Sequence, residues 1–173
     1  LATSSAASDV YKRQALGSYR EVGRACHLVT TNESRVMVDV GVNIASDTDP
    51  MPYFTAPEAL PLEKLDAVVL THSHLDHAGM LPVLFKYGYR GPVYCTPPTR
   101  DLMLLLQTDY IKVGGAEGKR PAYDMEDIRT CMKHVVDVEW GETTDITPDI
   151  KLTMSNAGHI LGSSALHLSL IHI

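Results

Sequence analysis

The sequence predicts an α/β layered domain, and three observations support this fold class. The chain has 173 residues, which is enough for one ordinary domain with a buried core. Apolar, β-branched runs such as Leu65–Leu70 alternate with helical patterns such as Pro98–Val113. A dense group of His and Asp residues directly follows the first of these runs.

The N-terminal half predicts three strands and one helix around a long loop. Leu65–Leu70 is almost entirely apolar, which suits a strand that is buried on both faces. Gly41–Pro61 holds four prolines and several small polar residues, so we expect a loop there. The other expected elements are strands at Cys26–Thr30 and Arg35–Val40, a turn at 31–34, and a helix at Ala78–Tyr87.

The C-terminal half predicts two helices and three strands. Pro98–Val113 is the stronger helix, and Thr96 or Thr99 is its candidate cap. Its residues Leu102, Leu105, Leu106 and Tyr110 share one apolar face, which we expect in the core. The other expected elements are strands at Pro92–Cys95, Val135–Val138 and Ile150–Met154, a mobile connector at Gly114–Arg120, and a helix at Tyr123–Lys133 with Asp124 and Glu126 near its start.

Composition narrows the class of protein. The formal charge of −6 gives no electrostatic reason to expect nucleic acid on this segment. Cys26, Cys95 and Cys131 form no C-x-x-C pair, so we expect buried free thiols in a reducing cytoplasm. No apolar run is long enough to span a bilayer, and the start of the chain has no apolar core of a secretory signal.

Both ends of the chain look foreign to the domain. Residues 1–14 contain SDVYKRQ, which resembles translated adapter read-through, and residues 169–173 resemble a second such scar. We therefore expect residues 15–168 to be the genuine sequence and to form the N-terminal part of a domain in a longer protein.

The residues that carry chemistry lie between positions 71 and 77, in the run THSHLDH. His72 and His74 are two apart, so on an extended segment they point the same way. Asp76 and His77 follow where the chain must turn, so they can face a second point. Imidazole and carboxylate groups suit zinc and related divalent metals. The run predicts a hydrolytic centre with two metals, and a solvated polar loop is the alternative.

Two residues elsewhere add to the expected site. Zinc takes about four ligands, so further donors must come from distant sequence. His159, flanked by Gly158 and Gly162, follows the apolar run Ile150–Met154 and is the donor that we expect. Asp39 ends another apolar run and can hydrogen-bond the ligand loop, although an Asp before Gly can also simply form a turn.

This pattern predicts hydrolysis. Two cations about 3.5–4 Å apart would lower the pKa of a shared water toward neutrality, and the hydroxide would attack phosphorus or a carbonyl carbon. Asp76 would orient that nucleophile. His27, His134 and His167 have no ligand partners nearby in the sequence, so we expect structural roles for them, and strand-end hydrogen bonds for Ser163 and Ser164.

The motifs resemble those of the metallo-β-lactamase superfamily, and Gly79-Met80-Leu81-Pro82 is typical of its β-CASP ribonucleases. Residues 17–24 look like the opening strand of that branch. Residues 86–113 and 157–163 are most similar to archaeal relatives of the cleavage and polyadenylation specificity factor nuclease. The resemblance covers residues 15–168.

The resemblance implies a four-layer αββα fold and zinc-dependent cleavage of RNA phosphodiesters. It implies endonuclease activity, joined in some members by 5′-to-3′ exonuclease activity, in 3′-end formation and transcription termination. His72, His74 and His159 would hold one Zn²⁺, Asp76 and His77 a second, and Asp39 would support them. Implied partners are RNA, the RNA polymerase or termination machinery, and a second copy in the full-length protein.

The family's bridging Asp, cap domain, general-acid His, last ligand His and KH-type region fall outside this sequence, so we expect the chain alone to bind zinc weakly and cleave nothing. Two other functions stay open on the same fold. One is a thioesterase or lactonase, which shares the metal chemistry. The other is a catalytically silent scaffold subunit, although all five visible ligands are intact.

Overall fold

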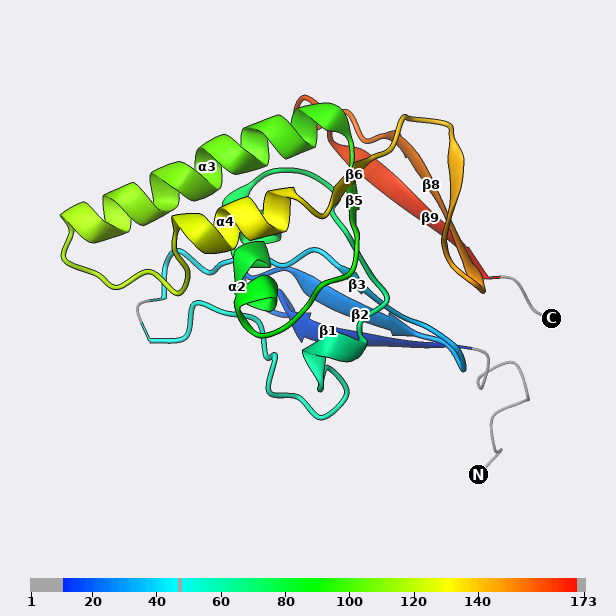
Figure 1. The fold of residues 1–173 in the computed structure, drawn as a ribbon, viewed down its shortest axis with the longest axis horizontal. Helices are drawn as coiled ribbons and strands as arrows, with labels where there is room; N and C mark the ends of the chain where they lie inside the picture. The colour runs from blue at the N-terminus through cyan, green and yellow to red at the C-terminus, as the bar shows by residue number, and fades with distance from the viewer. Residues whose placement is uncertain (1–10, 47, 171–173) are drawn as a thin grey trace.

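The computed structural model describes residues 11–46 and 48–170, which form two β-sheets with helices on one side (Figure 1). The larger sheet has the strand order β1-β2-β3-β4-β5-β6. Strands β1 to β3 pair antiparallel, and β3 to β6 pair parallel. Its strands are β1 (Lys12–Gly17), β2 (Cys26–Thr30), β3 (Arg35–Val38), β4 (Ala67–Val69), β5 (Val93–Cys95) and β6 (Val135–Asp137).

The smaller sheet is an antiparallel meander in the order β7-β8-β9. Its strands are β7 (Thr143–Thr147), β8 (Ile150–Asn156) and β9 (Ser164–Leu170). The inward residues of β8, Ile150, Leu152 and Met154, are fully buried and alternate with more exposed ones. This alternation means that β8 covers one face of the larger sheet.

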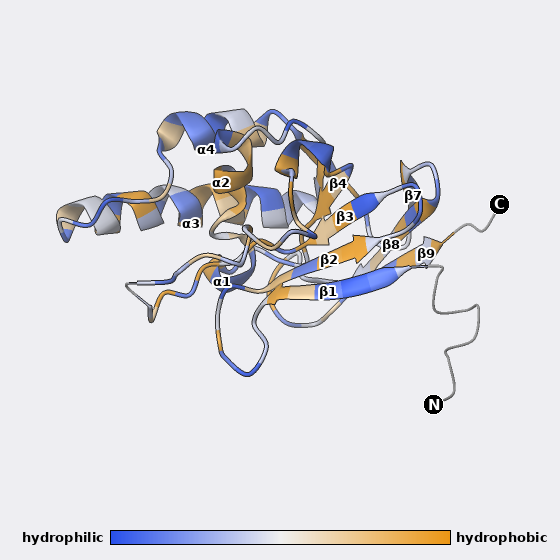
Figure 2. Cartoon of the chain, turned by 90° about the horizontal axis from the view of Figure 1, so that it is seen from below, coloured by the Kyte–Doolittle hydropathy of each residue, from blue (hydrophilic) through white to orange (hydrophobic). Residues whose placement is uncertain are grey.

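Two apolar cores hold the layers together. The core between the sheets includes Val36, Val69, Ile150, Leu152 and Met154. The other core lies between the larger sheet and the helices, and Figure 2 shows α2 (Leu81–Lys86) coloured hydrophobic beside that sheet. All three residues of β4 are buried, as expected for a strand with a core on each face. The predicted α/β class is therefore confirmed as helix, sheet and sheet layers.

The helix expected at Ala78–Tyr87 corresponds to α2, and a short helix that was not predicted, α1 (Leu75–Ala78), precedes it. A Cβ on Gly79 would lie 2.4 Å from the Leu75 carbonyl oxygen and 2.7 Å from a Val42 methyl carbon, so the break packs tightly. Pro82 then stands in the first turn of α2, where proline is tolerated because that N–H needs no partner in the helix. Asp76 and His77 consequently lie on α1 rather than on a loop.

The long helix α3 (Pro97–Ala116) differs from the expectation in two respects. Its buried residues are Thr99, Met103 and Gln107. Of the predicted core face, Leu102, Leu106 and Tyr110 are half-buried, but Leu105 is 63% exposed, so the prediction was wrong for Leu105. Leucines lie on several sides of this helix, so the sequence did not show which side contacts α1 and α4. The helix also includes Gly114, which was expected in a connector, and it closes at Gly118 with φ +73°.

The second predicted helix is confirmed as α4 (Met125–Met132), with Asp124 as its N-cap. The Asp124 carboxylate accepts hydrogen bonds from the backbone N–H groups of Glu126 and Asp127, and the Asp127 side chain accepts from the Asp124 N–H. This reciprocal capping box fixes where the helix begins.

Several strands lie outside the expected ranges. β7 and β9 were not predicted, because their exposed faces carry polar residues that weaken the apolar signal. The segment 18–24 is a loop after β1 rather than the opening strand, and Ser18, Arg20 and Arg24 have positive φ there. Residues 12–14 and 169–170, from the two segments that look foreign, pair in β1 and β9. Residues 1–10 and 171–173 lie outside the described residues.

The three cysteines are buried and free, as predicted. Among the residues that the structure describes, no helix has both the length and the apolar character needed to cross a membrane.

Candidate metal centre

The site begins where β3 and β4 end side by side. Val38 pairs with Val69 in this parallel ladder, so the residues after them emerge at the same edge of the sheet. Asp39 has φ +58°, a left-handed conformation that Asp tolerates better than most residues. Its backbone N–H donates to the Val69 carbonyl, and its carboxylate accepts from the Thr71 N–H at 2.8 Å. This geometry directs a buried carboxylate at the start of the histidine-rich segment.

Three imidazole rings meet above that edge. The Nε2 atom of His72 lies 3.1 Å from Nδ1 of His74, and Nε2 of His159 lies 3.2 Å from the same Nδ1. One ring nitrogen from each of the three histidines lies within 4.8 Å of those of the other two. His72 and His74 follow β4 in the larger sheet, whereas His159 follows β8 in the smaller one. The cluster therefore bridges the two sheets.

Thr71 sets the tautomer of His72. The Thr71 hydroxyl donates its single proton to the Asp39 carboxylate, with an O···O distance of 2.8 Å to Oδ2. The same hydroxyl oxygen lies 2.9 Å from Nδ1 of His72, so that nitrogen must be the donor. The lone pair of His72 then sits on Nε2, which is the nitrogen that faces His74 and can bind a cation.

The same carboxylate orients His77. Nδ1 of His77 lies 2.8 Å from Asp39 Oδ2, which leaves Nε2 for the opposite direction. That Nε2 atom lies 3.6 Å from Oδ2 of Asp76. Asp76 and His77 therefore form a second, smaller donor pair beside the three-histidine cluster, and Asp39 contacts them through His77.

Burial and nearby charges shift the pKa values of His72 and His77 in opposite directions. Burial, with added repulsion from His77, lowers the pKa of His72 to about 4 despite the nearby Asp39 carboxylate. His72 is therefore neutral at pH 7, as a metal ligand must be. Burial also works against the protonation of His77, but the hydrogen bond and charge of Asp39, with the charge of Asp76, outweigh it and raise the pKa of His77.

The residues present fit a divalent metal ion. Nitrogens on a tetrahedral zinc at about 2.0–2.1 Å lie about 3.3–3.4 Å apart, close to the separations from His74 to its two neighbours. Histidine lone pairs that face one another repel unless a proton or a cation lies between them. His72 Nε2 has no proton in the tautomer that Thr71 imposes, so either a proton on His74 Nδ1 or a cation must lie between these two nitrogens. A proton on His74 Nδ1 can serve only one of its two neighbours, whereas one cation can bind all three nitrogens at once.

An apolar groove of about 440 Å³ runs up to this cluster. His74 and Asp76 line one end, and Val22, Ile44 and Leu106 are among the residues that form its walls. Its outer wall comes from the loop after β1 and from the loop that follows Val42. His74 and Asp76 therefore face this groove.

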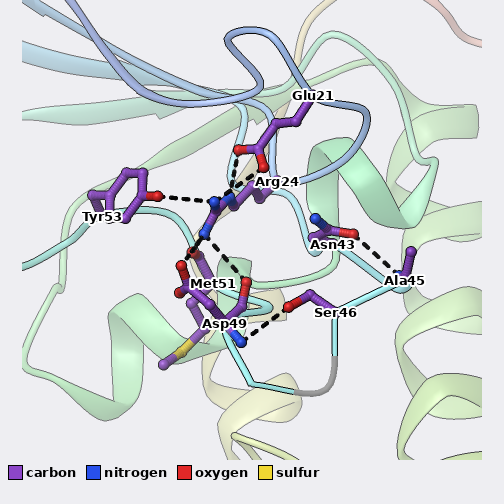
Figure 3. Close-up of polar contacts among 8 residues, drawn as sticks. All are labelled: Glu21, Arg24, Asn43, Ala45, Ser46, Asp49, Met51 and Tyr53. Carbon is purple, nitrogen blue, oxygen red and sulfur yellow. Dashed lines mark hydrogen bonds and ion pairs between the residues drawn. The ribbon is translucent and has the colours of Figure 1, made fainter.

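Arg24 fixes these two loops to each other (Figure 3). Its guanidinium group is ion-paired with Glu21 and Asp49 at 2.6 Å each. It also donates to the Met51 carbonyl and to the Tyr53 hydroxyl. Because Arg24 is only 6% exposed, these contacts satisfy its charge without solvent and stabilise the wall of the groove.

The structure brings together the residues that the sequence singled out, in one group of three imidazoles and one carboxylate–imidazole pair joined to Asp39. His27, His134 and His167 lie elsewhere, in contact with Tyr19, in contact with Phe85, and on β9 respectively. Ser163 accepts hydrogen bonds from the backbone N–H groups of His159 and Ile160, as a loop-end residue.

Sequence reasoning missed Thr71, although its position directly between a buried strand and His72 was a usable signal.

A family description, "Metallo-beta-lactamase superfamily domain", matches residues 28–171. The chain belongs to this superfamily. Metallo-β-lactamase structures share the fold: one from Cronobacter sakazakii has a TM-score of 0.60 and 18% identity, covering 90% of this chain and 56% of the other. A subclass B3 enzyme from a soil metagenome library, MEM-A1, has a TM-score of 0.60 and 17% identity, covering 92% and 55%. The partial αββα superfamily fold is thus established.

Closer relatives come from archaea. This superfamily member is 57% identical over 153 residues to the transcription termination factor FttA of Methanosarcina mazei and 56% identical to that of Methanocaldococcus jannaschii. The match to the Lokiarchaeum factor is 50% over 157 residues. The first two matches cover 88% of this chain and 24% of each relative. The chain therefore spans about a quarter of the length of these relatives.

Proposed function

We propose that this chain is the metal-binding segment of a zinc-dependent ribonuclease that cleaves RNA phosphodiesters in 3′-end formation and transcription termination. The observation that carries the proposal is the convergence of His72 Nε2, His74 Nδ1 and His159 Nε2 from two sheets, beside the Asp76–His77 pair. The similarity to termination factors supports RNA as the substrate. The chain's acidic charge supplies no affinity for RNA, so that affinity comes from other parts of the protein.

The proposed roles follow from the direction of each donor atom. His72, His74 and His159 hold one zinc ion, and Asp76 and His77 contribute to a second. Two bound zinc ions would stabilise charge on the phosphodiester oxygens and acidify a water molecule. Asp76 accepts a hydrogen bond from the attacking water and orients it. Asp39 holds His77 directly and His72 through Thr71, so it acts as a positioning residue.

The location and partners belong to the same proposal. The free, buried cysteines agree with a reducing cytoplasm. The names of the relatives point to the transcription machinery, with RNA as the bound nucleic acid. A second copy of the full-length protein is the remaining proposed partner, on the family resemblance alone.

A chimera tests this function. The matching 153-residue segment of the Methanosarcina mazei factor is replaced by that of this chain, and cleavage of single-stranded RNA is measured with zinc present. The chimera is expected to cut RNA, and His74→Ala is expected to lower the rate at least about 10³-fold, because it removes the nitrogen shared by both close contacts in the cluster. His167→Ala, on the exposed face of β9, is the matched control.

Full activity of the His74→Ala chimera would reject the proposed centre. Hydrolysis of a thioester or lactone, with no RNA cleavage, would assign the fold to another class of hydrolase. A chimera that folds and binds zinc but hydrolyses none of these substrates would indicate a scaffold subunit.

A further inference from the structure

The loop that carries His159 is tied to the start of α3 by a pair of threonine hydroxyls. Thr96 Oγ1 donates to the Gly162 carbonyl at 2.7 Å, and Thr99 Oγ1 donates to the same oxygen at 3.1 Å. Both threonines are almost fully buried, at 4% and 0% exposed. The two hydroxyl oxygens also lie 2.9 Å from each other, and the Ser164 hydroxyl donates to the same carbonyl at 3.3 Å. The Gly162 carbonyl is therefore held in a small buried group of hydroxyls, to which Thr96 contributes the shortest contact.

Thr96 makes this contact in place of its usual local role. It occupies the N-cap position of α3 with extended backbone angles, yet its side chain makes no capping hydrogen bond. An N-cap threonine normally accepts from a backbone N–H in the first turn of its own helix. Of the two candidate caps, Thr96 or Thr99, the N-cap position belongs to Thr96, but the predicted capping role was wrong because its hydroxyl donates to Gly162 instead.

The close contact between this loop and α3 requires glycine at position 162. Gly162 has φ +81°, and a Cβ there would lie 2.8 Å from Thr96 Oγ1 and 2.9 Å from both Pro98 Cβ and the Thr99 nitrogen. Any side chain would push this loop away from α3. The close approach therefore depends on glycine on one side and on two small hydroxyl residues on the other.

Hydrogen bonds within the turn from His159 to Gly162 couple the position of Gly162 to that of His159. The Ser163 hydroxyl accepts from the backbone N–H groups of both His159 and Ile160, and the Ser163 N–H donates to the Ile160 carbonyl. The next residue, Ser164, donates its N–H to the Thr71 carbonyl at 2.8 Å. A displacement of Gly162 must therefore move His159 relative to His72 and His74.

We propose that Thr96 and Thr99 are positioning residues for the metal centre, which set the distance of His159 Nε2 from the other two imidazole nitrogens through Gly162. This inference rests on the proposed function, because it concerns the same three-histidine site. The threonines contact no metal or substrate. Their effect passes through the Gly162 carbonyl and the Ser163 turn.

The test measures Co²⁺ and Zn²⁺ affinity of this chain in which Thr96 and Thr99 are both replaced by Val, which keeps their shape and removes both hydroxyls. Metal affinity is expected to fall about 10- to 100-fold, the usual effect of losing a group that orients a ligand. The visible absorption of bound Co²⁺ is expected to change as the third nitrogen moves. The Thr96→Ser, Thr99→Ser double variant, which restores the hydroxyls, is expected to regain wild-type affinity.

A matched control separates positioning from general stability. Thr143 and Thr153 form an exposed pair with their hydroxyls 2.8 Å apart on β7 and β8, far from α3 in the sequence. Their double Val variant should leave metal affinity and the Co²⁺ spectrum unchanged. Thermal unfolding without metal is recorded for every variant.

These variants distinguish failure of the three-histidine site from failure of the positioning role. If His159→Ala leaves metal affinity unchanged, the proposed three-histidine site itself is wrong. If His159→Ala weakens binding but the Thr96, Thr99 double Val variant does not, only the positioning role is overturned. An equal loss in the Thr143, Thr153 control also overturns it. If the double Val variant fails to fold, Thr96→Val alone is measured, and an unchanged affinity there counts against the proposal.

Discussion

Asp39 serves two imidazoles with one carboxylate. Its Oδ2 atom accepts from the Thr71 hydroxyl and from His77 Nδ1, each at 2.8 Å, and its Oδ1 accepts from the Thr71 N–H. With 3% exposure, the carboxylate has almost no solvent to satisfy it, so these donors matter individually. One buried charge therefore fixes the ring orientation on both sides of the centre.

Asp39→Asn tests this role without changing the shape of the residue, and Asn also tolerates the left-handed backbone at this position. The amide has one acceptor oxygen instead of two and no charge, so it cannot hold Thr71 and His77 equally. We expect zinc affinity to fall about 10- to 100-fold, measured by competition with a chelator. Asp66→Asn, which alters an acceptor for the Arg35 N–H at the other end of β4, is the control. An Asp39→Asn chain with wild-type affinity would contradict this role.

At the scale of single residues, the candidate metal ligands could be predicted from the sequence, whereas the threonines that orient them could not. His and Asp at close spacing are chemically distinctive, so His72, His74, Asp76 and His77 could be selected directly. Thr71, Thr96 and Thr99 act through hydroxyls that are common in every protein. Only the positions of the Asp39 carboxylate and the Gly162 carbonyl show which hydroxyls matter.

The turn between β7 and β8 is anchored to the turn between β2 and β3. The Ser34 hydroxyl donates to the Asp149 carboxylate, which also accepts from the Thr147 hydroxyl at 3.1 Å. Burial raises the pKa of Asp149, but hydrogen bonds from Ser34, Thr31 and Thr147 outweigh this, so its pKa lies below its usual value. The contact joins the two sheets at their ends.

Ser34→Ala removes the hydroxyl that donates to Asp149. We expect the free energy of unfolding at pH 7 to fall by about 2 kcal/mol, as for a buried hydrogen bond to a charged group. Since the folded-state pKa is lowered, the stabilisation is present above the unfolded value near 3.8 and is lost as the pH falls through the folded value. In urea unfolding, the difference between the two chains should therefore begin to shrink as the pH falls below about 4 and should disappear only below the folded-state pKa of Asp149. A difference that is constant with pH would contradict this account.

At the scale of elements, strongly patterned segments were predictable and weakly patterned ones were not. The all-apolar run of β4 and the acidic start of α4 each carry a local signal. The buried face of α3 does not, because Leu104, Leu105 and Leu106 are consecutive and so point in different directions on a helix. Contacts from α1 and α4 decide which face is covered, and those come from distant sequence.

At the scale of the whole molecule, the centre joins two sheets that share only an apolar core and a few polar contacts. His72 and His74 belong to the edge of the larger sheet, and His159 belongs to the smaller one. A cation bound to all three adds a link between layers that is absent from the unfolded chain. Metal binding and folding should therefore be coupled.

Zinc should accordingly raise the unfolding temperature of this chain. At a free zinc concentration 100 times the dissociation constant, the stabilisation is about 2.7 kcal/mol. His159→Ala should lose most of the gain because it disconnects the smaller sheet, whereas His134→Ala should keep it. Calorimetry with and without a chelator measures this, and equal gains in both variants would contradict it.

His74 and His159 are separated by 85 positions in the chain. During synthesis, His72, His74, Asp76, His77 and the Asp39 carboxylate leave the ribosome well before His159 does. An ion captured early would meet an incomplete set of donors and could exchange freely. On the proposed assignment, the three nitrogens come together only when the meander has closed over the first sheet, so the order of translation delays the three-histidine cluster until the two layers have met.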